Sequence, residues 1–67
     1  MTAVQKVDEL MPDVSALTGE QSLSLVRVVE RQGVENIVSI GIGFEGVCFV
    51  NANGMYIGIE KDGYAHT

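Results

Sequence analysis

Residues 37–60 read IVSIGIGFEGVCFVNANGMYIGIE, and this stretch contains the clearest structural pattern of the chain. Its apolar residues recur at every second position, which is typical of β-strands. Two glycine-containing turns interrupt the pattern, one at 43–46 and one at Asn53-Gly54, and Asn-Gly is a strong signal for a two-residue hairpin. The stretch therefore predicts a three-stranded antiparallel meander. Its strands are expected over residues 37–42, 47–52 and 55–60, and residues 61–67 follow as a short tail.

The lengths of the two turns predict which residues share a face of the sheet. A two-residue loop at Asn53-Gly54 pairs Val50 with Ile57, and a three-residue loop at 44–46 pairs Ile40 with Val50. One face is then apolar throughout and is expected to lie under helices: Val38, Ile40, Ile42, Cys48, Val50, Met55, Ile57 and Ile59. The opposite face is expected to be open: Ile37, Ser39, Gly41, Gly43, Val47, Phe49, Asn51, Tyr56, Gly58 and Glu60.

Two stretches with the helical period precede the meander. Each begins with a Thr-x-x-Gln capping box, one at Thr2 and one at Thr18. Pro12 is expected to end the first helix, because the residue before a proline is disfavoured in the helical region. Gly33 fits the left-handed position that closes the second helix. The helices are expected over about 2–11 and 19–32. Residues 1–67 thus predict one small α+β domain, with two N-terminal helices packed on one face of the meander (ααβββ).

Composition narrows the classes of function. The chain has 67 residues, nine acidic and four basic, and a net charge of −5. This balance disfavours nucleic acid as a partner, because nucleic-acid binders cluster Lys and Arg against phosphate. The acidity either favours a protein partner with a basic surface or only keeps a small protein in solution. One cysteine and one histidine allow neither an internal disulfide nor a closed zinc site. No signal peptide or apolar run of about 20 residues is present, so we expect a cytoplasmic protein without membrane contact.

The residues that could carry chemistry do not form a catalytic pattern. Residues 41–46 match G-x-G-x-x-G, but a strand follows them instead of the helix that would hold a pyrophosphate. Cys48 is expected to lie in the core, where a thiol behaves as a small apolar group. His66, in the expected tail, has no orienting partner that the sequence identifies. We therefore predict no enzymatic activity, no catalytic residues, no cofactor and no metal site.

The leading functional hypothesis is a small acidic protein-interaction module, an inhibitor or regulator that binds and blocks a partner's surface. A phage or mobile-element inhibitor of a host defence complex is one version, based on size and charge alone. Glycines around Phe49 on the open face favour close approach of another molecule, although an aromatic ring can also simply cover neighbouring glycines. The candidate contact residues are Phe49, Tyr56, Asn51, Glu60 and Glu45.

Two alternatives belong to other classes. In the first, the chain is a winged-helix-like DNA-binding regulator, in which the second helix reads DNA and the Asn53-Gly54 hairpin is the wing. Arg27 and Arg31, one turn apart on that helix, favour this alternative. In the second, the chain is a homodimer or a structural subunit of a larger assembly, held through the unpaired edges of the first and third strands.

Overall fold

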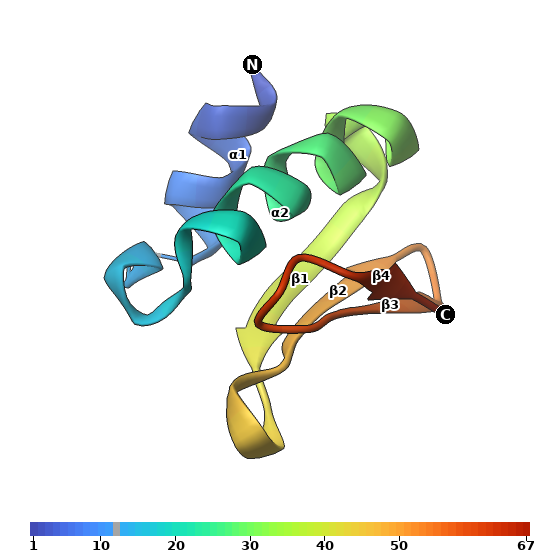
Figure 1. Cartoon of the computed structure of the whole chain (residues 1–67). Coiled ribbons are helices and arrows are strands. Elements are labelled where there is room, and N and C mark those ends of the chain that lie inside the picture. The colour runs from blue at the N-terminus through green and yellow to red at the C-terminus, as the bar shows by residue number, and fades with distance from the viewer. Residues whose placement is uncertain (12) are drawn as a thin grey trace.

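The computed structural model of the chain describes residues 1–11 and 13–67. It has two layers, with helices in one and an antiparallel sheet in the other (Figure 1). The helices are α1 (Ala3–Leu10) and α2 (Gly19–Gln32), and the strands, in spatial order, are β1 (Ile37–Ile42), β2 (Cys48–Ala52), β3 (Met55–Ile59) and β4 (Ala65–His66). Three short 3-10 turns complete the fold: η1 (Val14–Ala16), η2 (Val34–Asn36) and η3 (Phe44–Gly46). The predicted α+β class, with helices on one face of the sheet, is confirmed.

Both helices begin as their sequences predict. The side chain of Thr2 accepts a hydrogen bond from the Gln5 amide, and the Gln5 side chain accepts one from the Thr2 amide. Thr18 and Gln21 repeat this arrangement at the start of α2. Gly33 ends α2 with a φ of 92°, a conformation in which a side chain would be strained. The predicted role of Pro12 lies outside the described residues.

The predicted strand register is confirmed over most of the sheet. Val50 lies opposite Ile40 on one side and Ile57 on the other. At the start of β1, however, a bulge shifts the register, since Ile37 pairs with Ala52 and Ser39 with the preceding residue of β2. The extra residue, Val38, has no partner, and the strand bends there.

The bulge reverses two predicted positions. Val38, predicted to be buried, is 56% exposed, and Ile37, predicted to lie on the open face, is only 5% exposed. Side chains alternate between the two faces with a period of two, so an inserted residue moves the residues that precede it to the opposite face. Ile42 and Met55 lie on the predicted face but at strand ends next to a turn, where the cover of the helices ends, and each is about two-fifths exposed.

The predicted tail is in part a fourth strand. Ala65 pairs with Ile59 and His66 with Gly58, so the third strand is not a free edge over its last two residues. The connecting turn is closed by a hydrogen bond from the Glu60 amide to the Tyr64 carbonyl. A two-residue strand is too short to produce an alternating apolar pattern, which is why the sequence reads as a tail.

The core lies between the sheet and the helices, and one buried polar side chain joins the two layers. The fully buried residues of largest volume are Leu25, Ile59, Gln21, Val29, Val50 and Cys48. The side-chain Nε2 of Gln21 donates to the backbone carbonyls of Gly46 (2.8 Å) and Ile59 (2.9 Å). Thr18 and Ser24 donate to the carbonyls of Lys61 and Gly63. The first two turns of α2 and its N-cap therefore hold the turns at one end of the sheet.

Candidate partner-binding face

The face of the sheet that points away from the helices, which we call the outer face, is not covered by any described element. Strand register and side-chain alternation place nine residues on it: Ser39, Gly41, Phe49, Asn51, Tyr56, Gly58, Glu60, Tyr64 and His66. Three of them are aromatic rings with large exposed fractions, 42% for Phe49, 63% for Tyr56 and 64% for Tyr64. An exposed group of this kind is uncommon on a monomeric protein unless it contacts something.

The central row of the outer face combines rings and glycines. Gly41, Phe49, Gly58 and His66 are neighbours across the four strands. A Cβ atom built on Gly58 would lie 3.0 Å from His66 Cε1 and 3.6 Å from Phe49 Cε1, and one on Gly43 would lie 2.5 Å from Phe49 Cε2. The two rings therefore lie over the backbone of these glycines. The ring of Phe49 covers Gly43 and part of Gly58, leaves Gly41 open, and still keeps two-fifths of its surface exposed.

A second group lies beside this row. His66 Nε2 is 2.7 Å from Glu60 Oε2, and the His66 ring stacks on Tyr64 with centroids 5.7 Å apart. Sequence reasoning missed both contacts because it treated these residues as a tail. The signal that could have found them is the Lys61-Asp62-Gly63 turn followed by outward-facing residues at alternate positions, Tyr64 and His66.

The structure brings four of the five predicted contact residues together. Phe49, Asn51, Tyr56 and Glu60 all lie on the outer face. Asn51 is opposite Tyr56, and its Oδ1 accepts a hydrogen bond from the Gly54 amide (2.8 Å), so this side chain also holds the hairpin turn. Glu45 lies apart, in the exposed η3 turn, where its φ of 60° is left-handed.

The groups with potential chemical reactivity are separate from one another. Cys48 lies in the core, and burial raises the pKa of its thiol from 9.0 to about 11, so the unreactive protonated form dominates at neutral pH. Within residues 1–11 and 13–67, no three side chains of His, Cys, Asp or Glu are grouped in a way that could hold a metal ion. The Glu60–His66 pair lies on an open surface, where the two side chains are 43% and 41% exposed.

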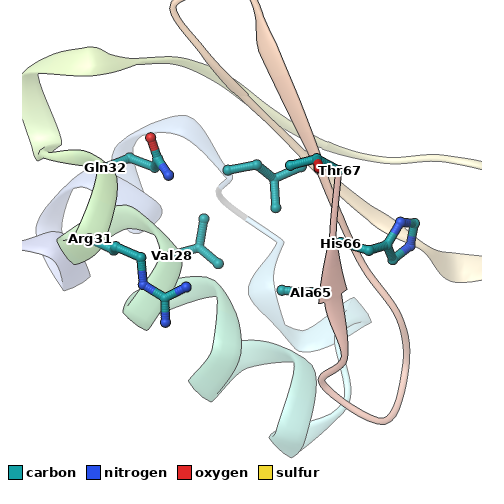
Figure 2. Close-up of a pocket in the computed structure, with 7 residues that line it drawn as sticks. Val28, Arg31, Gln32, Ala65, His66 and Thr67 are labelled. Carbon is teal, nitrogen blue, oxygen red and sulfur yellow. The ribbon is translucent and has the colours of Figure 1, made fainter.

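A cleft of about 210 Å³ lies between α2 and the C-terminal strand. Figure 2 shows that Val28, Arg31 and Gln32 approach it from α2, while Ala65 approaches it from β4. His66 and Thr67 also line the cleft, and the imidazole of His66 extends from β4 on the side opposite Val28 (Figure 2). A smaller groove of about 140 Å³ lies between the two helices and is mostly apolar. His66 is the one outer-face residue among those that line the two hollows.

Neither described helix has the length and apolar character that crossing a membrane requires. Comparisons of the chain with protein-family models, with curated proteins and with solved structures give no match.

Proposed function

We propose that this protein is a non-enzymatic interaction module that binds a partner protein through the outer face and blocks the partner's surface. The observation that carries the proposal is the exposure of Phe49, Tyr56 and Tyr64 on the one sheet face that no described element covers. Aromatic side chains supply much of the binding energy of protein interfaces, since each buries a large area.

The rings on this face are partly ordered before any partner arrives. Phe49 contacts Gly43 and lies close to Gly58, and Tyr64 stacks on His66. A side chain already held in position loses little rotational freedom on binding, which lowers the entropic cost of association. Gly41 leaves its side of the outer face open, since a Cβ atom built on it would meet nothing within 4 Å, so a partner can approach the backbone closely there.

The charge of the chain favours a basic partner. Glu60 lies on the outer face, Glu45 lies in the neighbouring turn, and the net charge is −5. One surface with complementary charge is a basic groove in which a partner protein binds nucleic acid. An inhibitor from a phage or a mobile element would block such a groove. Opposite charges would chiefly increase the association rate, and the effect would weaken with salt.

The test is a double variant, Phe49→Ala with Tyr56→Ala, compared with wild type in a pull-down from the native host. A matched control is Leu23→Ala, which removes an apolar side chain that is 57% exposed on α2. We expect the double variant to keep its circular dichroism spectrum and lose the partner, and the control to keep both. Equal capture by all three proteins would show that the outer face is not the binding surface.

A further inference from the structure

The edge of the sheet formed by β1 carries backbone N–H and C=O groups that pair with no other strand in the described part of the chain. In the order β1-β2-β3-β4, β1 pairs only with β2, whereas β3 has β4 on its other side at Gly58 and Ile59. We call the side of Ile37–Ile42 that points away from β2 the β1 edge. Of the two strands at the ends of the sheet, β1 is the longer, with six residues against two for β4.

The register identifies which groups face the β1 edge. The Gly43 amide donates to the Val47 carbonyl at 2.8 Å, so these two residues form a hydrogen-bonded pair. Hydrogen-bonded and non-hydrogen-bonded pairs alternate along an antiparallel ladder. Ile42 and Ile40 therefore direct their N–H and C=O groups away from β2. Among the described residues, none of the turn, cap or loop hydrogen bonds between backbone groups involves either isoleucine.

The β1 edge has little of the protection that proteins usually give to such strands. Exposed edges are commonly blocked by lysine, proline, a bulge or a covering loop. Ile37–Ile42 contains no charged residue and no proline. The bulge protects only the start of the strand, and Ser39, Gly41 and Ile42 beyond it are exposed. The second half of the strand is therefore available for pairing.

The charges around the β1 edge favour one kind of occupant. Glu35 lies just before the strand and Glu45 just after it, and both are exposed. A second copy paired antiparallel would bring Glu35 of one chain toward Glu45 of the other, and each chain has a net charge of −5. Like charges in that arrangement repel. A segment with Lys or Arg at both ends has the complementary charge, especially at the Glu35 end, because Lys61 already lies against Gly46 next to Glu45.

We propose that the β1 edge binds an extended segment of the partner protein as an added strand, with an uncharged centre and basic residues at both ends. The inference rests on the proposed function, because it describes how the same partner is held. The β1 edge is also continuous with the outer face. Gly41 lies on that face at the β1 edge, and a Cβ atom built on it would meet nothing within 4 Å. Alternate side chains of an added strand would extend the aromatic row beyond Phe49.

The probe is a synthetic peptide of five alternating valines and threonines with two arginines at each end, added to ¹⁵N-labelled full-length protein. At saturating peptide, we expect the backbone amide protons of Ile40 and Ile42 to exchange with solvent at least about tenfold more slowly than without peptide. The same peptide with glutamates at both ends should give no protection. Protection of amides elsewhere, protection that is equal with glutamate ends, or no protection at millimolar peptide would each overturn the proposal.

Two variants with the same change of charge separate the β1 edge from general electrostatics. Ile42→Lys places a cation on the edge at a side chain that is 42% exposed, and Leu23→Lys places one on α2. We expect Ile42→Lys to lower peptide affinity about tenfold or more, as a like charge at a strand edge should, and Leu23→Lys to have much the smaller effect. Equal effects of the two variants would contradict pairing at this edge.

Two further measurements distinguish this inference from the proposed function and from self-association. If Ile42→Lys still captures the native partner while the Phe49→Ala, Tyr56→Ala double variant does not, the outer face binds and the edge inference is wrong. If only Ile42→Lys loses the partner, the edge binds and the outer-face proposal is wrong. Light scattering that gives a dimer without peptide, with Ile40 and Ile42 already protected, would assign the edge to a second copy and overturn the inference.

Discussion

The two faces of this sheet are built from the same strands and have opposite properties. On β2 and β3 the residues that face the helices, such as Val50 and Ile57, are almost fully buried, while their immediate neighbours Phe49 and Tyr56 are 42% and 63% exposed. Nothing in the chemistry of a phenylalanine requires this exposure. Burial is concentrated on the covered face, so we expect substitutions on the outer face to leave the fold intact.

The largest difference in the free energy of unfolding is expected between substitutions of two neighbouring residues of β3. Ile57→Ala removes a buried side chain and leaves a cavity, which should lower the free energy of unfolding by about 2–5 kcal/mol. Tyr56→Ala, on the outer face, should change it by about 0.5 kcal/mol or less. Because a domain of this size has only a few kcal/mol in total, the first variant should be largely unfolded. Urea denaturation followed by circular dichroism measures both, and similar losses for the two variants would contradict the division between faces.

The covered face is also held by a polar contact, and Gln21 tests how much that contact contributes. Gln21→Leu keeps a side chain of similar size but leaves the carbonyls of Gly46 and Ile59 without their donor. An unsatisfied buried group costs about 1–3 kcal/mol. Gln5→Leu is the matched control, since Gln5 occupies the same capping-box position in α1 but is exposed, and the loss of one exposed cap bond should cost less. Denaturation curves in urea that shift equally for both variants would show that burial of Gln21 adds nothing.

Most of this architecture follows from local sequence signals. Asn53-Gly54 sets the pairing of β2 with β3, and the two Thr-x-x-Gln motifs set the helix starts, because each depends only on residues a few positions apart. The exposure of Phe49 and Tyr56 follows from that register. These features could therefore be predicted with no knowledge of the tertiary structure.

The features that the sequence did not predict depend on distant contacts. The bulge at Val38 leaves an alternating pattern intact and changes only which face each residue occupies. The Glu60–His66 contact requires β4, whose two residues carry too little pattern to be recognised. Gln21 reads as an ordinary cap residue, and only the packing of α2 against the turns of the sheet shows that it donates to two carbonyls there.

An effect of pH on stability is expected from Cys48, which faces the core directly beside the exposed Phe49. Burial raises the pKa of its thiol from 9.0 to about 11. The folded state therefore holds this proton more tightly than the unfolded state, so the associated stability is complete below pH 9 and is lost as the pH rises from 9 toward 11. Urea midpoints should be flat from pH 7 to 9 and then fall, and Cys48→Ala should reduce that fall.

Thiol labelling provides the corresponding comparison between the faces. At pH 8, Cys48 should react slowly with a thiol reagent in the folded protein and rapidly in urea, because both burial and the scarcity of thiolate oppose attack. A Tyr56→Cys variant in a Cys48→Ala background moves the thiol to the outer face and should react rapidly without urea. If the two thiols reacted at the same rate in the folded protein, Cys48 would be accessible, and the covered face would open far more readily than its packing implies.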